Sequence, residues 1–178
     1  MVGDSYYQSS KKQDWATPIE FINWAVEEGV MCQPTFDVAA APHNAKAPKY
    51  FTKEDNALIQ SWPSGVLFCN PPFGNELKLF ISKALDELWA GPEKMEVWFL
   101  IPARVDTIWF HELVWPNAEE IYFIRGRLNF LEHGKEKKAN ATFPNMLVRF
   151  LGPNSRIKWD GCDPIVSTLE PPLDARGR

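Results

Sequence analysis

The tetrapeptide Asn70-Pro71-Pro72-Phe73 combines residue types that suit chemistry on an aromatic amino group. Such an amino nitrogen is a poor nucleophile because its lone pair is shared with the ring. The side-chain oxygen of Asn70 and the backbone carbonyl of Pro71 could each accept a hydrogen bond from the amino group and so localise that lone pair. The prolines fix the backbone, and Phe73 offers a flat face for stacking. The tetrapeptide is therefore a candidate site for group transfer to nitrogen.

A simpler interpretation is that Asn-Pro-Pro forms only a turn, because prolines are common in turns. The flanking sequence favours a reactive site instead. The apolar run Gly65–Cys69 precedes the tetrapeptide and is typical of a buried strand. From Leu77 onward, apolar residues recur at the three- and four-residue spacing of an amphipathic helix. A loop between a strand and a helix is where α/β folds place their ligand sites.

The other elements are predicted from hydrophobic periodicity and from helix-capping residues. Thr17, Pro18 and Glu20 form a capping box that predicts a helix from Thr17 to about residue 28, ended by Gly29. Apolar runs predict strands over residues 35–39, 65–69, 97–101 and 121–124, and a short helix is expected over residues 106–114. Residues 127–131 and 146–151 are expected to pair as an antiparallel hairpin that finishes the sheet.

Alternating strands and helices predict an α/β fold with a doubly wound, mostly parallel sheet and a C-terminal antiparallel hairpin. Ligands bind to such sheets in the crevice beyond the carboxyl ends of the strands. Asp37 and Asn70 both stand at the ends of predicted strands. We therefore expect both residues at that crevice.

The length and composition indicate one domain. The chain has 178 residues, 45% of them hydrophobic, which is enough for one core and too little for two typical domains. We expect a flexible segment over residues 1–13, a catalytic domain over residues 14–152 and a loosely packed tail over residues 153–178. No secretory signal or membrane-length apolar run is found, so a cytoplasmic protein is expected. The spacing of histidine and cysteine predicts no metal site.

The formal net charge of -4 is unfavourable for a nucleic-acid partner, so any such contact requires a local basic patch. Residues 125–138 contain five basic residues against two acidic ones, a local charge of +3. The lysines of this stretch are typical of a solvated hairpin loop. Arg104, Arg125 and Arg127 are the better candidates for phosphate contacts, because a basic stretch that follows a strand near the expected crevice is typical of a phosphate-binding surface.

Several short motifs, in one order along residues 15–150, carry a resemblance to a known family. The chain resembles the phage and prophage Dam-type DNA N6-adenine methyltransferases, and its tetrapeptide is similar to motif IV of amino-group methyltransferases. The resemblance rests on Trp15-Ala16-Thr17-Pro18, Phe36-Asp37-Val38-Ala39-Ala40, Asn44-Ala45-Lys46, Tyr50-Phe51-Thr52, Asp55-Asn56-Ala57-Leu58, the tetrapeptide, Pro102-Ala103-Arg104-Val105-Asp106-Thr107 with Trp109-Phe110, and Arg125-Gly126-Arg127-Leu128.

The resemblance implies a Rossmann-like fold that binds S-adenosyl-L-methionine and methylates a flipped adenine in duplex DNA. It implies that the tetrapeptide is catalytic and that the cofactor pocket is formed by Trp15, Thr17, Pro18, Asp37, Ala39, Asp55 and Asn70. Asp55 would contact the adenine of the cofactor, although its position is equally typical of a helix N-cap. Ala39-Ala40-Ala41-Pro42 departs from the glycine-rich loop that most of the wider superfamily has at this place.

Two other functions stay open on the sequence. The same tetrapeptide serves methylation of other sp2 amino nitrogens: cytosine N4, guanine N2 in RNA, or a glutamine amide. The chain could also be a DNA-binding protein that has lost catalysis, although the presence of Asn70 with both prolines speaks against such a loss. The sequence predicts no obligate protein partner.

Overall fold

The structure is a computed structural model that describes residues 15–90, 94–132, 138–141, 143–152, 164–172 and 175–177. The predicted flexible segment, residues 1–13, lies outside the described residues. The described part of the chain forms one large sheet, one small sheet, two α-helices and one short π-helix.

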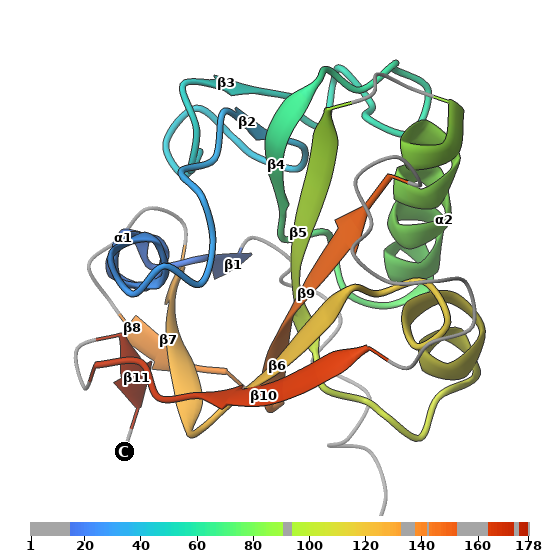
Figure 1. The fold of residues 1–178 in the computed structure, drawn as a ribbon. Coiled ribbons are helices and arrows are strands. Elements are labelled where there is room, and N and C mark those ends of the chain that lie inside the picture. Colours follow the sequence, from blue (N-terminus) through green and yellow to red (C-terminus); the bar gives the residue numbers. More distant parts are fainter. Residues whose placement is uncertain are drawn as a thin grey trace, which may run out of the picture.

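Within the described residues the main sheet has seven strands in the order β10-β6-β9-β5-β4-β2-β3 (Figure 1). All neighbouring pairs are parallel except those made by β9, which runs antiparallel to both β5 and β6. The predicted α/β fold with a mostly parallel sheet is confirmed. The strands are β2 (Phe36–Asp37), β3 (Lys49–Tyr50), β4 (Gly65–Cys69), β5 (Met95–Pro102), β6 (Glu120–Ile124), β9 (Asn145–Leu151) and β10 (Ile165–Leu169).

Helices cover both faces of this sheet, which explains why its central strand is apolar at almost every position. Alternate residues of β5 point to opposite faces. Val97, Phe99 and Ile101 pack into the core beneath α2 (Asn75–Ala90), whereas Trp98 and Leu100 pack into the core beneath α1 (Ile19–Glu27). Figure 1 shows the two helices on opposite sides of the sheet. The doubly wound arrangement predicted from the sequence is therefore present.

The predicted C-terminal hairpin is wrong in its pairing. β7 (Arg127–Glu132) leaves the main sheet and pairs antiparallel with β8 (Lys138–Asn140), β1 (Trp15–Ala16) and β11 (Arg176–Gly177). β9 inserts between β5 and β6. Its burial explains the choice, because six of its seven residues are buried and an edge position would expose one side of that apolar strand to solvent.

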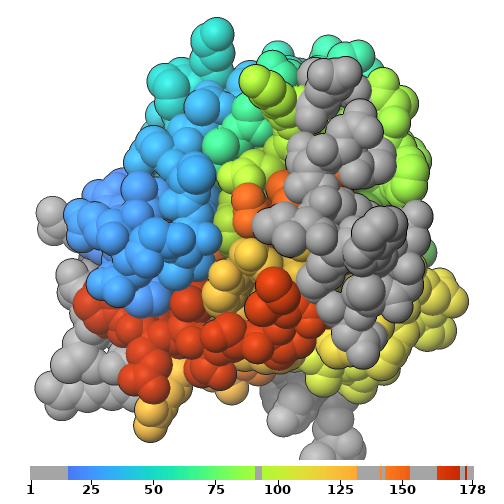
Figure 2. All heavy atoms as spheres, viewed as in Figure 1, coloured from blue at the N-terminus to red at the C-terminus, as the bar shows by residue number. Residues whose placement is uncertain are grey.

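The described residues of the predicted tail beyond Gly152 pair with the rest of the fold, and some of them pack into its core. β10 pairs with β6 over five consecutive residues, and Leu169 and Ala175 are buried in the core beneath α1. The red C-terminal atoms in Figure 2 form a continuous band below the blue N-terminal helix. This part of the chain extends the sheet and closes one side of the core.

The helix limits agree with the sequence at one end of α1 and differ at the other. Gly29 has φ +70°, and the N–H groups of Gly29 and Val30 donate to Val26 and Ala25, the pattern of a Schellman C-cap. The capping box is wrong: Pro18 occupies the N-cap position, and no side chain caps the helix. The predicted helix over residues 106–114 is reduced to a helical segment that includes the π-helix η2 (Phe110–Val114). None of the described helices has the length and apolar character needed to cross a membrane.

We expect Gly65→Ala to destabilise the fold more than Gly29→Ala. Both residues have positive φ, which costs an L-residue about 1–2 kcal/mol. A Cβ at Gly65 would in addition lie 2.6 Å from Oγ1 of Thr35, a hydroxyl that donates to the carbonyl of Val66, whereas a Cβ at Gly29 meets nothing within 4 Å. The extra cost is about 1 kcal/mol, the worth of that hydrogen bond.

Urea unfolding measures both free energies. In a Thr35→Ala background the oxygen is gone, so the difference between Gly65→Ala and Gly29→Ala should narrow by about 1 kcal/mol. An unchanged difference between the two glycines in that background would contradict the steric explanation.

Candidate active site at the carboxyl edge of the sheet

The carboxyl ends of β2, β4 and β5 lie at one edge of the sheet because the three strands are parallel neighbours. Val38 and Ala39 follow β2, Asn70 follows β4 and Ala103 follows β5. β9 runs the other way, so its first residue, Asn145, pairs with Pro102 at the same edge. Segments distant in the sequence therefore meet at one edge of the sheet.

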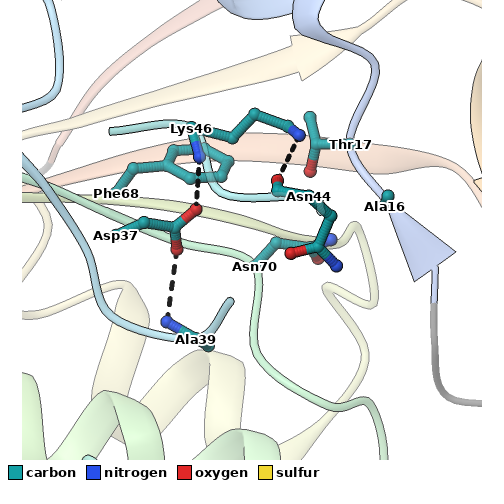
Figure 3. A pocket seen from close by; sticks show the side chains of 8 residues that line it. All are labelled: Ala16, Thr17, Asp37, Ala39, Asn44, Lys46, Phe68 and Asn70. Carbon is teal, nitrogen blue, oxygen red and sulfur yellow. Dashed lines mark hydrogen bonds between the residues drawn. The ribbon is translucent and has the colours of Figure 1, made fainter. Parts of the chain in front are cut away.

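A small polar notch opens at this edge (Figure 3). Its enclosed volume is about 10 Å³, room for a group of about the size of one water molecule. A larger ligand could place only one end in the notch and would have to extend along the open edge. Its lining residues are Ala16, Thr17, Asp37, Ala39, Asn44, Lys46, Phe68 and Asn70.

The carboxylate of Asp37 holds the loop between β2 and β3 in place. One oxygen accepts the N–H of Ala39 at 3.2 Å, and the other accepts the N–H of Lys46 at 2.9 Å. The side chain is only 2% exposed, and burial raises the pKa of this carboxyl from its ordinary 3.8 to about 6, against the lowering effect of the two hydrogen bonds and of the Lys46 charge. Asp37 thus carries a buried charge that is only partly compensated.

Lys46 brings a second charge into the same notch. It is 8% exposed, and its ammonium donates to the backbone carbonyl of Asn44. Burial lowers the pKa of Lys46, while the nearby charges of Asp37 and Glu20 oppose that shift. Asn44 in turn accepts the N–H of Ala41 through Oδ1 at 2.7 Å, which closes a tight turn of the loop. The notch therefore holds one negatively charged side chain, Asp37, and one positively charged side chain, Lys46.

Thr17 contributes a hydroxyl that no group in the described structure satisfies. Its side chain is 2% exposed, and Oγ1 is buried without a hydrogen-bond partner. The residue follows β1, which is held by pairing with β7, and its hydroxyl is not used to cap α1. An unsatisfied buried hydroxyl costs free energy, so Thr17 is a candidate donor or acceptor for a ligand in the notch.

The tetrapeptide lies where the sequence predicted, directly after β4. Asn70 is half-buried and lines the notch, so the proposed acceptor lies beside Asp37 and Lys46. Pro71 is buried, and Pro72 and Phe73 are half-buried. α2 begins two residues after Phe73, as the apolar spacing predicted.

Comparison with known proteins gives a family match to the DNA N-6-adenine-methyltransferase (Dam) model over residues 4–158. The chain belongs to this family. It is 30% identical over 152 residues to the DNA N-6-adenine-methyltransferase of Haemophilus phage HP1, covering 84% of this chain and 85% of the phage protein. It is 31% identical over 115 residues to the enzyme of the same name from Escherichia phage T1, covering 64% of this chain and 45% of that protein. The resemblance to phage Dam-type enzymes is confirmed.

A solved structure is also similar. A protein assigned to the class I S-adenosylmethionine-dependent methyltransferases from Listeria monocytogenes superposes with a TM-score of 0.49 and 12% identity, covering 86% of this chain and 65% of the other.

Not every predicted cofactor residue of this Dam-family chain reaches the notch. Asp55 is exposed, and one of its carboxylate oxygens accepts both the N–H and the hydroxyl of Thr52, at 2.8 and 2.7 Å, which lowers the pKa of Asp55. Pro18 is buried at the start of α1 and is not among the lining residues. The backbone of Trp15 belongs to β1, but its side chain lies outside the described residues. Thr17, Asp37, Ala39 and Asn70 do line the notch.

Two of the three predicted DNA-contacting arginines, Arg104 and Arg125, follow the carboxyl ends of β5 and β6, whereas Arg127 is the first residue of β7 in the small sheet. Arg104 is exposed, with its guanidinium carbon 4.3 Å from the ring centroid of Phe143. Arg125 is exposed and paired with Glu170 at 2.5 Å. Arg127 is half-buried, and its Nη1 is buried without a partner in the described structure. The side chains of the lysines at 135, 137 and 138 lie outside the described residues.

Sequence analysis did not assign a role to Lys46 or Asn44, although both stand in a motif that carries the family resemblance. A lysine in a loop is normally solvated, so its type gives no sign of burial. The alanine- and proline-rich surroundings of residues 39–48 are the one signal that could have indicated a closely packed loop. In the described part of the chain, no group of three or more potential metal ligands comes together.

The raised pKa of Asp37 predicts a specific dependence of stability on pH. A carboxyl with a pKa of about 6 in the fold and 3.8 when unfolded keeps its proton more tightly in the folded state. Its contribution to the free energy of unfolding is therefore greatest below pH 4 and falls by up to about 3 kcal/mol as the pH rises through 6. Subtracting the curve of Asp37→Asn from that of the parent protein should reveal this fall.

Asp55→Asn is the matched control, because the pKa of Asp55 is lowered and its effect has the opposite sign. Removing that carboxylate should remove stability that is present above its ordinary pKa and lost as the pH falls. A difference curve for Asp37 that is flat between pH 4 and 6 would show that its charge is not penalised by burial.

Proposed function

We propose that this chain transfers a methyl group from S-adenosyl-L-methionine to the exocyclic amino group of a flipped adenine in DNA. One observation supports this above the others: Asn70, the acceptor of the family tetrapeptide, lines the same notch as the buried pair Asp37 and Lys46. The group that would orient the substrate and the groups that would hold a charged cofactor thus lie at one point of the sheet edge.

The donor set of the notch fits the methionine end of the cofactor. That end carries an ammonium and a carboxylate, and the notch offers Asp37, Lys46 and the unsatisfied hydroxyl of Thr17. Each charge of such a ligand would meet a group of opposite sign in a buried place, where charge-assisted hydrogen bonds are strong. When bound, S-adenosyl-L-methionine supplies an electrophilic methyl group on a sulfonium centre.

The tetrapeptide would prepare the nucleophile. The side-chain oxygen of Asn70 and the carbonyl of Pro71 hold the two N–H bonds of the adenine amino group, so its lone pair is directed at the methyl group. Pro71 and Pro72 restrict the backbone and keep these acceptors in place between turnovers. Phe73 stacks on the base, which offsets part of the few kcal/mol required to flip adenine out of the duplex.

Arg104, Arg125 and Arg127 are proposed to contact the DNA backbone around the flipped base. Arg104 is the strongest candidate, because it is exposed at the carboxyl edge next to the aromatic ring of Phe143. Arg125 has part of its charge compensated by Glu170. A DNA substrate would place the reaction in the cytoplasm of a bacterial host.

The competing functions differ in the product. Incubation of plasmid DNA with radiolabelled cofactor, followed by digestion to nucleosides, identifies the methylated base. N6-methyladenine is the expected product. Methylated cytosine would show that the methyl group is transferred to cytosine and not to adenine. Cofactor binding without any labelled nucleoside would favour an inactive DNA-binding protein.

We expect Asn70→Ala to lower the rate of methyl transfer by at least about 100-fold, the loss typical when one positioned hydrogen-bonding group is removed from an active site. Cofactor affinity should fall much less, because Asn70 is proposed to hold the amino group of the base. Single-turnover kinetics and calorimetry measure the two effects separately. Asn75→Ala, exposed at the start of α2, is the control that should keep activity. Parallel losses of affinity and rate in Asn70→Ala would assign Asn70 to the cofactor alone.

Arg104→Ala should weaken DNA binding and reduce the slope of log affinity against log salt by about one, the value for one lost phosphate contact. Arg125→Ala should have a smaller effect, because Glu170 already pairs with that charge. Lys94→Ala removes an exposed charge at the opposite end of β5 and serves as the control. Equal slopes for the parent protein and Arg104→Ala would exclude a phosphate contact by Arg104.

A further inference from the structure

Lys46 carries an ammonium group on a side chain that is largely buried. Taking an ammonium out of water is expensive, so proteins bury lysines with partners that compensate the charge. In the described part of the chain the Lys46 ammonium donates to one group, the carbonyl of Asn44. An ammonium has three N–H donors, so a single carbonyl satisfies only one of them.

Asp37 does not account for the remaining donors. The hydrogen bond between the two residues runs from the backbone N–H of Lys46 to Oδ2 of Asp37 and leaves the ammonium out. Lys46 could hold the loop through its backbone whatever its side chain was. The position of the charged end in the notch therefore requires another explanation.

The loop after β2 also lacks the usual means of holding an anionic group. In many α/β folds a glycine-rich loop and a helix N-terminus supply backbone N–H groups to a negatively charged ligand. Here turns, not a helix, connect β2 to β3. The N–H groups of Ala39 and Lys46 are already taken by the carboxylate of Asp37.

Thr17 supplies an independent second observation. Its Oγ1 is buried without a partner in the described structure and lines the same notch as Lys46. A hydroxyl and an ammonium together form a donor pair suited to a carboxylate. Figure 3 shows both groups on the notch, opposite the Asp37 carboxylate.

We propose that Lys46, together with the hydroxyl of Thr17, binds the carboxylate of the methionine moiety of the cofactor. The proposal rests on the proposed function, because it assigns a residue to one group of the proposed cofactor. Lys46 supplies the positive charge that a helix N-terminus supplies in many other α/β folds. Asp37 would then lie beside the ammonium group of the methionine moiety. The methionine zwitterion then meets complementary charges at both of its ends.

The experiment compares three nucleosides that differ at the methionine end. S-Adenosylhomocysteine has the carboxylate and the amine, decarboxylated S-adenosylmethionine has only the amine, and 5′-methylthioadenosine has neither. Calorimetry gives the affinity of each for the parent protein, for Lys46→Met and for the control Lys49→Met, which removes an exposed charge on β3.

Lys46→Met should lower the affinity for S-adenosylhomocysteine by about 10- to 100-fold, the loss expected for one hydrogen bond to a charged group. The two nucleosides without a carboxylate should bind to it as they bind to the parent protein. Lys49→Met should leave all three affinities unchanged. If Lys46→Met lowers the affinity for all three nucleosides equally, the proposal is overturned and Lys46 is a structural residue of the loop.

A measurement on the parent protein covers the case in which Lys46→Met does not fold. With the lysine ammonium groups labelled with 15N, the Lys46 signal should shift on addition of S-adenosylhomocysteine and stay in place with 5′-methylthioadenosine. A Lys46 signal that shifts with neither ligand would overturn the proposal. If none of the three nucleosides binds to the parent protein, it is the cofactor assignment in the proposed function that fails.

Discussion

The buried carboxylate of Asp37 is the constraint on which the site depends. It ties Ala39 and Lys46, at the two ends of a loop, to the carboxyl end of β2. Burial raises the pKa of this group to about 6, so its charged form is penalised even with two hydrogen bonds. That residual penalty favours a cationic ligand, because a positive group beside Asp37 would recover free energy that folding has left unsatisfied.

The small sheet positions one residue of the notch. β1 pairs with β7, and Thr17 follows β1 directly, so this pairing delivers the Thr17 hydroxyl to an edge that belongs to the other sheet. β11 pairs with the same strand near Arg127. The C-terminal residues therefore support the segment that positions one wall of the notch, and two of them, Leu169 and Ala175, are buried in the core.

The sequence predicted the residues whose signals are local and missed those that depend on tertiary structure. Asn70 and Asp37 could be placed because apolar runs and prolines mark strand ends. The pairing of β9 could not, since strand order is set by burial against distant segments. Thr17 has the type and spacing of an N-cap, but in the fold its hydroxyl does not cap α1, and the residue lines the notch. Lys46 resembles any solvated loop lysine until the fold surrounds it.

The two reactants of the proposed reaction have opposite electrostatic requirements. A sulfonium cofactor favours a negative environment, whereas DNA requires positive charge at the surface. The fold separates these by depth: Asp37 is buried in the notch, and Arg104 is exposed beside Phe143 at the rim of the same edge. Asn70 is half-buried and lines the notch, at the point where a flipped base would leave one environment and enter the other. An acidic chain can act on DNA in this way, because only the rim has to be basic.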